Sequence, residues 1–251
     1  MEIKSNTKFC HFTSIDNARN ILSSESFFLS KYSKMNDLAE SKIHEKQDRR
    51  AFVLCFSNSE ALNIPAFYLY GGIDGKGCRI QFTDARIRSL INDSDIYYVN
   101  KQNKPLKKAV SKSEYRIYYD WIYYISRDGY CEHKSERKQF GSSIDTALQE
   151  LEKDNKHFFV KSPIWRYENE FRIVVVFEKD IPYDRISIKF AMNNKNSGVS
   201  IMCGPETKPE EYEQLKAEFR DYGVNKFKSS SDYAISMNLV DRNRQLLKGI
   251  V

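Results

Sequence analysis

The sequence predicts an α+β fold, on three observations. The run FRIVVVF (171–177) is apolar almost without alternation, which is typical of a strand buried on both faces in the middle of a sheet. Amphipathic helical patterns lie between the strand patterns without the regular alternation of parallel α/β proteins. At 251 residues with 41% hydrophobic residues, the chain can bury a sizeable core. One domain over 1–251 with an insertion near 100–160 is the simplest organisation.

Local signals place the elements in order. Ser14 is a good N-cap for a helix whose apolar face is Ile15, Ala18, Ile21 and Leu22. Further helices are predicted from Asn36 to about Gln47, as a turn or short helix at 60–72, after Thr83 to 93, after Ser143 to 154, and from Thr207 and Pro209 to Gly223. Strands are predicted at 26–30, 51–57, 77–82, 96–99, 171–177, 186–190 and 199–204.

Composition excludes several classes. No apolar run has the roughly 18 residues of a membrane span, and MEIKSNTKF lacks the apolar core of a secretory signal, so we expect a cytoplasmic protein with no membrane partner. The cysteines are odd in number, spread singly and without a CxxC pair, which predicts neither a disulfide framework nor a metal site. They are Cys10, Cys55, Cys78, Cys131 and Cys203, of which only Cys131 has a histidine, His133, close by.

A basic segment suggests a polyanionic partner. The net charge is +6, and between Lys101 and Arg116 six basic residues face one acid, Glu114. A solvated loop explains this segment, and so does contact with nucleic-acid phosphates. The tyrosine-rich stretch 115–124 that follows suits stacking on unpaired bases or a tyrosine-rich core equally well. The residues predicted to bind nucleic acid are Lys104, Lys107, Lys108, Lys112 and Arg116.

The segment KSPIWRYENEFRIVVVF (161–177) is the most informative. Read as a continuous strand, it directs Trp165, Tyr167, Phe171 and Ile173 to one face and Arg166, Glu168, Glu170 and Arg172 to the other. A salt-bridge ladder on a solvated face is one interpretation. The other interpretation is that these charges line a cleft at the start of a central strand. There, repulsion raises the pKa of one carboxyl while the arginines hold the other ionised, an asymmetry that catalytic pairs use.

Two further places carry candidate residues. The glycines of YGGIDGKG (70–77) match no nucleotide fingerprint, and DGKG before CRIQF is typical of a hairpin turn. Tyr70 precedes small residues that leave its ring face open to a planar ligand. His11, with Thr13, stands where a strand gives way to a helix N-terminus, a place where phosphate-rich ligands dock, although a lone histidine there is also a common structural group.

Six blocks taken in order resemble the bacterial family known as domain of unknown function 2971. They are HFTSIDNARNILSSESFFLS, KMNDLAES, FVLCFSNS, FYLYGGIDGKGCRIQF, KSPIWRYENEFRIV and IMCGPETKPEEYEQL, and they span roughly 9–235 without the basic insertion. That family carries a His-Tyr-Thr start, an Asn-Asp-Pro segment, a Cys-Phe-Ser strand, a Trp-x-x-Tyr-Gly turn and a Glu-x-Glu-x-Arg strand. This chain departs from the pattern with Phe67 for Trp, Leu38 for Pro and no glycine after the first helix.

The first block also resembles the DarT toxins, which are ADP-ribosyltransferases with a His-Tyr-Glu type of triad on a split β-sheet with flanking helices. The resemblance implies NAD as substrate and no metal. It implies that His11 bonds the adenosine-side ribose, that Tyr70 stacks on nicotinamide, and that Glu170 is the catalytic glutamate supported by Glu168. It further implies NAD contacts from Phe12, Thr13, Asn36 and Arg172, the last holding Glu170 ionised or binding the pyrophosphate.

The sequence is therefore expected to encode an NAD-dependent ADP-ribosyltransferase, a toxin or anti-phage defence effector that modifies RNA or DNA and is paired with an antitoxin or another defence-system protein. The alternatives are a transferase acting on protein and a catalytically inactive module that senses a nucleotide or a partner. A metal-dependent nuclease fits poorly, because carboxylates flanked by arginines are poor hosts for a divalent cation.

Overall fold

The computed structural model describes residues 3, 5–35, 50–58, 64–72, 74–134, 136–190 and 198–229. The chain forms two compact units, each assembled from separate stretches. The first unit comprises Met1–Phe9, Ser24–Asn58 and Thr83–Ala191, and the second comprises Cys10–Ser23, Ser59–Phe82 and Met192–Val251. The helix predicted from Asn36, and Asn36 itself, lie outside the described residues.

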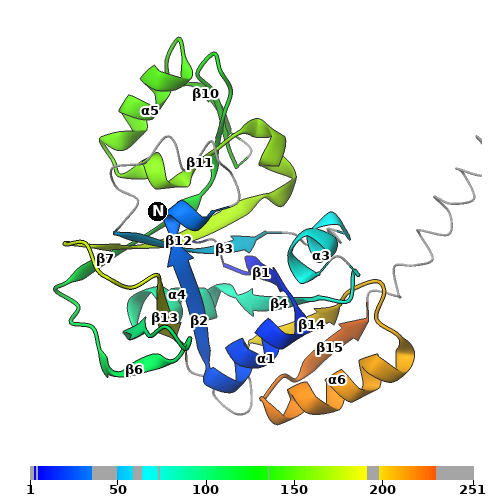
Figure 1. Ribbon diagram of the computed structural model, residues 1–251. Coiled ribbons are helices and arrows are strands. Elements are labelled where there is room, and N and C mark those ends of the chain that lie inside the picture. The colour runs from blue at the N-terminus through cyan, green and yellow to red at the C-terminus, as the bar shows by residue number, and fades with distance from the viewer. Residues whose placement is uncertain are drawn as a thin grey trace, which may run out of the picture. The chain divides into compact units, whose positions relative to one another are not determined.

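The main sheet of the first unit is built around β12 (Glu170–Phe177), the apolar strand that the sequence places at the centre of a sheet. It pairs antiparallel with β3 (Ala51–Ser57) on one side and with β7 (Tyr115–Trp121) on the other (Figure 1). Residues 170–175 of β12 are all buried, which confirms the prediction. Beyond β3 the order continues through β2 (Ser26–Lys31), β13 (Arg185–Lys189), β5 (Ile96–Val99) and β6 (Pro105–Ala109).

The junction between β2 and β3 is short. Their pairing consists of Ser30 opposite Val53 and Lys31 opposite Phe52, whereas β12 pairs with β3 along its whole length. Strand β6 ends the order, so the basic segment 101–116 contains an edge strand and is not only a loop. Lysines on an edge strand also discourage pairing with another chain, which is a structural reason for their presence.

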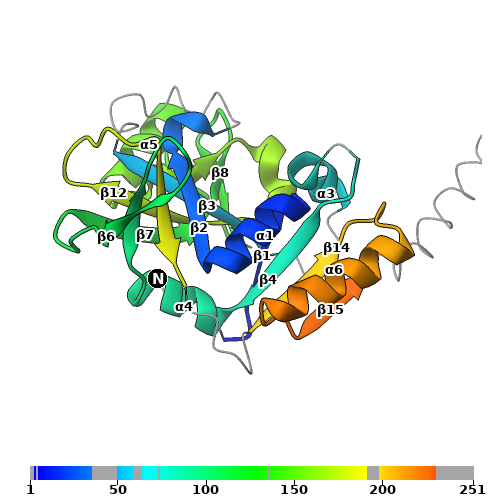
Figure 2. The same cartoon turned by 60° about the horizontal axis from the view of Figure 1, so that its bottom comes forward.

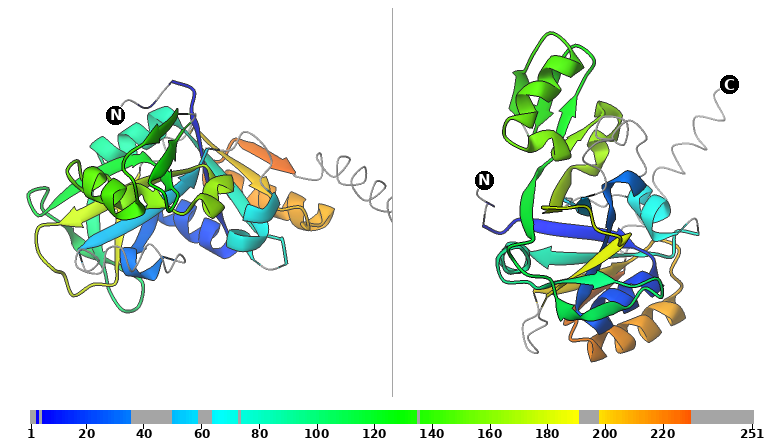
Figure 3. Two further views of the ribbon diagram at one scale, coloured as in Figure 1. Left: turned by 90° about the horizontal axis from the view of Figure 1, so that it is seen from above. Right: turned by 60° about the vertical axis from the view of Figure 1, so that its left-hand side comes forward.

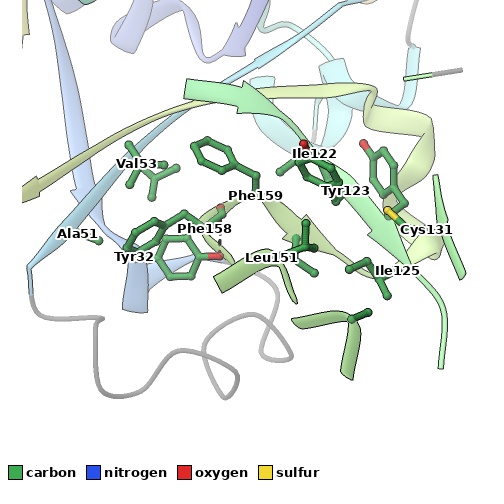
Figure 4. Packing of buried hydrophobic residues seen from close by; sticks show 14 residues of the cluster. Tyr32, Ala51, Val53, Ile122, Tyr123, Ile125, Cys131, Leu151, Phe158 and Phe159 are labelled. Atoms are coloured by element: carbon green, nitrogen blue, oxygen red, sulfur yellow. Dashed lines mark hydrogen bonds between the residues drawn. The ribbon is translucent and has the colours of Figure 1, made fainter. Parts of the chain in front are cut away.

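The first unit also contains a small second sheet. It has the order β10-β9-β8-β11 and is accompanied by α5 (Figure 3, right). The bounds are β8 (Tyr123–Ile125), β9 (Tyr130–His133), β10 (Glu136–Gln139), α5 (Ile144–Glu152), η2 (Lys156–Phe159) and β11 (Val160–Lys161). Its buried cluster includes Tyr32, Ile122, Leu151, Phe158 and Phe159 (Figure 4). Aromatic side chains of the insertion therefore form core.

Local signals set the helices of the first unit. Ser143 caps α5 as predicted, because its Oγ accepts a hydrogen bond from the Thr146 backbone N–H at 3.3 Å and Thr146 Oγ1 accepts from the Ser143 N–H. Thr83 precedes α4 (Asp84–Asn92) in an extended conformation but makes no side-chain capping bond. The short turns η1 (Tyr32–Lys34) and η3 (Pro163–Glu168) complete the unit.

The second unit contains the order β15-β14-β4, with α6 beside β14 and β15 (Figure 2). An ion pair between Arg19 and Glu218, with Nε and Oε1 2.8 Å apart, joins α1 to α6. Its small core consists of Cys10, Phe12, Ala66, Phe67 and Met202. The bounds are β1 (Lys8–Thr13, whose first residues belong to the first unit), α1 (Ile15–Ser24), α3 (Ile64–Gly71), β4 (Cys78–Thr83), β14 (Val199–Cys203), α6 (Pro209–Asp221) and β15 (Lys226–Ser229).

One turn prediction is wrong. The DGKG segment precedes β4 as expected, but it follows helix α3, so it is a helix-to-strand loop and not a hairpin. Gly75 adopts φ +66° there, and its N–H donates to the Gly72 carbonyl at 2.9 Å. Across the described residues, no helix is long and apolar enough to cross a membrane.

Candidate functional site

The segment 161–177 is not one continuous strand, which corrects the predicted charge ladder. Pro163 opens the 3-10 turn η3, and Asn169 closes it in the left-handed conformation with φ +42°. A strand's alternation therefore begins only at Glu170. Arg166 pairs with Glu132, with 2.5 Å between Nη1 and Oε2. The reason is the proline, which favours a turn over an extended strand here.

Two carboxylates and two cations nevertheless meet in the first unit. Lys161 Nζ lies 2.5 Å from Glu168 Oε2 and 3.0 Å from Glu170 Oε2, so one ammonium group bridges both acids. We call Lys161, Glu168, Glu170 and Arg172 the carboxylate cluster. Each of these four side chains is at most 8% exposed. The predicted pairing of Glu168 with Glu170 is present, but the group that joins them is a lysine that the sequence pattern did not single out.

Arg172 supplies the second cation. Its Nε lies 2.5 Å from Glu170 Oε1, and its Nη2 lies 3.3 Å from Glu170 Oε2. Its remaining donors reach the Phe158 carbonyl at 3.1 Å and the Tyr32 hydroxyl at 3.3 Å. Because Arg172 is fully buried, the geometry assigns it to holding Glu170, and the alternative of binding a pyrophosphate finds no support in its contacts.

The backbone around the cluster is also fixed. Ser57 Oγ donates to the Glu168 carbonyl at 2.5 Å, and the Glu170 N–H donates to the Tyr124 hydroxyl at 3.1 Å. Lys161 Nζ lies 4.9 Å from the centre of the Trp165 ring, a cation–π distance. Residues of β3 and β8 therefore help to hold the carboxylate cluster, whose own members come from β11, η3 and β12.

The pKa of Glu170 is lowered. Burial by itself raises the pKa of a carboxyl, but attraction to Arg172 and Lys161 and hydrogen bonds from Arg172 and Cys55 outweigh that effect. Glu170 therefore stays ionised at pH values well below the ordinary pKa of a glutamate. The pKa of the Cys55 thiol shifts in the opposite direction, because burial and the Glu170 charge raise it well above the usual value.

Four of the residues expected to contact NAD, His11, Phe12, Thr13 and Tyr70, belong to the second unit. His11 is half-buried in β1, Thr13 is buried at the end of that strand, and Phe12 packs at right angles on Phe67 with ring centres 5.1 Å apart. Phe12 is thus part of the small core of this unit. Tyr70, in the last turn of α3, is 37% exposed.

The predicted nucleic-acid residues all lie at the surface of the first unit. Lys107 and Lys108 are on the edge strand β6, and Lys104 and Lys112 are in the turns before and after it. All four are exposed. Arg116 is exposed on β7, but its Nε pairs with Glu178 Oε1 at 3.3 Å, which reduces its availability for phosphates.

Sequence reasoning missed Lys161 and Tyr124. A signal for Lys161 was present, since this lysine directly follows the apolar run FFV (158–160) and a buried charge requires a partner. Tyr124 carried no such signal, because one tyrosine among many gives no indication of which hydroxyl meets the Glu170 backbone.

Comparisons of this chain with protein-family models, with curated proteins and with solved structures find no match. The carboxylate cluster is thus the observation from which a function can be argued.

Proposed function

We propose that the protein is an NAD-dependent ADP-ribosyltransferase that modifies a nucleic acid and acts as a toxin or anti-phage effector. The resemblance of its first sequence block, HFTSIDNARNILSSESFFLS, to such enzymes suggests the activity. The observation that carries the proposal is Glu170, an ionised carboxylate at the first position of the central strand β12, with Glu168 two residues before it.

The chemistry suits this arrangement. Cleavage of the bond between nicotinamide and ribose develops positive charge on the sugar, and a fixed carboxylate stabilises that charge. Lys161 and Arg172 keep Glu170 in the anionic form that this role needs. In the proposed reaction the acceptor forms the new bond to the ribose carbon, and nicotinamide leaves with the electrons of the old bond. Glu168 polarises the acceptor, whose proton passes to solvent water.

Nucleic acid is the proposed acceptor because of charge. Lys104, Lys107, Lys108 and Lys112 are exposed around one edge strand, where they are suited to contact phosphates. If they do, binding of single-stranded RNA or DNA weakens steeply as salt is raised, and replacing all four with Gln lowers the slope of that dependence by about 3 to 4. A salt-independent interaction, or an unchanged slope, argues for a protein acceptor.

One observation favours a second candidate, a catalytically inactive module that senses a nucleotide or a partner. Both carboxylate oxygens of Glu170 already contact cations, and the residue is only 4% exposed. A carboxylate so fully paired is also what a purely structural ion cluster requires.

The two candidates are separated by measuring nicotinamide release from NAD with single-stranded RNA, single-stranded DNA or cell lysate. The transferase proposal predicts turnover by the wild type that is lost in Glu170→Gln. Because that variant removes a buried charge, Tyr70→Ala provides an independent test at an exposed position, and Leu69→Ala, also exposed in α3, is its matched control.

We expect Tyr70→Ala to lose at least about tenfold in turnover, the effect of one lost ring stack, and Leu69→Ala to retain wild-type turnover. No turnover by folded wild-type protein with any of the polymers or lysate overturns the transferase proposal in favour of the sensing module.

A further inference from the structure

Two cysteines of the second unit lie directly opposite each other. Cys78 is the first residue of β4 and Cys203 is the last residue of β14, and the antiparallel register of these strands pairs the two residues (Figure 2). Both are fully buried, and neither forms a disulfide in the structure. The carboxylate cluster contains neither of them, so the proposed reaction does not account for the pair.

The hydrogen bonds of the ladder determine how closely the two cysteines approach. Just beyond them, the Gly204 N–H donates to the Gly77 carbonyl at 2.7 Å. Hydrogen-bonded pairs alternate with non-hydrogen-bonded pairs in an antiparallel ladder, so Cys78 and Cys203, one step farther in, form a non-hydrogen-bonded pair. Residues paired in this way have Cα atoms about 4.5 Å apart and side chains on the same face. A disulfide needs Cα atoms about 4.4–6.8 Å apart, so the backbone spacing fits one.

The chain segments beside the cysteines are packed tightly together. A Cβ on Gly204 would overlap with the Gly75 carbonyl oxygen, so only glycine permits this approach. The Glu206 N–H donates to the same carbonyl at 3.4 Å. The loop before β4 and the residues after β14 therefore hold the two strand ends against each other at the position of the cysteines.

Two other cysteines in strands are placed differently. Cys55 lies opposite Arg172 of β12. Cys131 lies opposite Lys138 of β10 and Ile125 of β8. None of these partners is a cysteine, so these strand pairings give neither thiol a second thiol to react with.

Burial also controls how readily the pair reacts. It raises the pKa of the Cys203 thiol to about 12, and burial together with the charge of a Cys203 thiolate raises the pKa of the Cys78 thiol. The thiolate is the reactive form of a cysteine, so a brief exposure to oxidant at neutral pH leaves the pair reduced. A longer exposure is needed, and a disulfide once formed is shielded from external thiols by the same burial.

We infer that sustained oxidation joins Cys78 to Cys203 in a disulfide that links β4 to β14. With hydrogen peroxide as the oxidant, one sulfur attacks the O–O bond and becomes a sulfenic acid while water leaves. The other sulfur then forms the S–S bond and displaces the hydroxyl group as a second water, so that both thiol protons end in water. The inference goes beyond the proposed transferase activity and needs neither NAD nor the carboxylate cluster.

The disulfide should stabilise the second unit. It joins the stretch Ser59–Phe82 to the stretch Met192–Val251, and the loop that it closes contains all of Thr83–Ala191. A bond that closes so long a loop restricts the unfolded chain strongly.

The test is prolonged incubation of the folded full chain with hydrogen peroxide, followed by removal of the peroxide with catalase. Thiols are then counted in denaturant, and an unreduced tryptic digest is examined by mass spectrometry. The wild type should lose two of its five thiols, with the peptides of Cys78 and Cys203 linked within one chain. Cys203→Ala should form no disulfide. Cys131→Ala is the matched control, because Cys131 is also buried but lies on β9, and it should lose two thiols as the wild type does.

Thermal unfolding gives a second readout. The oxidised wild type and oxidised Cys131→Ala should each melt at least about 5 °C above their reduced forms, and Cys203→Ala should show no such rise. If Cys203→Ala does not fold, Cys78→Val, which keeps a strand-forming side chain, takes its place.

The inference is overturned if no bond forms between Cys78 and Cys203, whether all thiols persist, are oxidised without a crosslink, or pair in another way. A crosslink that leaves the melting temperature unchanged also overturns it. Because neither readout uses NAD, an inactive transferase leaves these outcomes unchanged.

Discussion

Arg172 binds the carboxylate of Glu170, two positions before it on the same strand, with its Nε 2.5 Å from Oε1 and its Nη2 3.3 Å from Oε2. Neighbours two apart on a strand point to the same face, so β12 itself brings the pair together. Arg172 is fully buried, and Lys161 approaches the same carboxylate with Nζ 3.0 Å from Oε2. The anion is thus neutralised from two sides inside the first unit.

This arrangement predicts an acid-sensitive fold. The pKa of Glu170 is lowered in the folded protein and takes its ordinary value, about 4.5, in the unfolded chain. The stabilisation is therefore complete above about pH 5 and is lost as the pH falls toward the folded-state value. Glu170→Gln should reduce the free energy of unfolding by about 3–5 kcal/mol at pH 7, since it leaves buried cations underpaired.

The measurement is urea unfolding of the wild type and Glu170→Gln at pH 7, 5, 4 and 3. The difference between the two proteins should shrink as the pH falls. Glu150→Gln, at an exposed position of α5, is the control and should follow the wild type at every pH. A gap between wild type and Glu170→Gln that stays constant over this range contradicts the assignment.

Lys161 should matter most when both acids are charged. Lys161→Met removes the ammonium that bridges Glu168 and Glu170, and we expect a loss of about 3–5 kcal/mol in the free energy of unfolding at pH 7. Lys153→Met removes an exposed lysine paired with Glu150 and should cost about 0.5 kcal/mol or less. Equal effects of the two substitutions in urea unfolding at pH 7 would show that the bridge adds nothing.

The capping box of α5 can be tested with adjacent serines. Ser143→Ala removes the acceptor of the Thr146 N–H and should cost about 1 kcal/mol. Ser142→Ala changes an exposed serine outside the box and should leave the melting temperature unchanged. The prediction fails if the two variants melt together.

The glycines before β4 should be intolerant of side chains. A Cβ on Gly77 would lie 2.2 Å from Gly71 Cα, and neither backbone can yield as a flexible side chain could. Gly77→Ala should therefore destabilise the second unit by at least about 2 kcal/mol. Lys226→Ala, at an exposed position of β15 in the same unit, serves as the reference. The measurement is thermal unfolding of the two variants. A Gly77→Ala protein as stable as Lys226→Ala would refute the close approach of Gly77 to Gly71.

The sequence by itself determined the α+β class and most of the elements. The patterns at Ile15–Ser24 and Ala51–Ser57 depend on spacing within one element, which the chain displays directly. The cap at Ser143 and the buried strand from Glu170 were predictable for the same reason. The juxtaposition of Glu168 with Glu170 was expected from a continuous strand, but it arises from the turn η3, which ends at Glu168, and from Lys161, which contacts both acids.

Only the tertiary structure decided which groups surround these acids. Lys161 reaches Glu170 because β11 pairs with β8 and the turn η3 returns the chain to β12, a relation that no spacing in the sequence encodes. The same holds for His133 and Asp120, which lie 13 residues apart on β9 and β7 and meet at one wall of a cavity. Patterns along a chain report which face a residue takes within its own element, whereas contacts between elements depend on how strands pair and turns redirect them. For that reason Glu168, Glu170 and Arg172 were identified from the sequence, whereas Lys161 was found only in the fold.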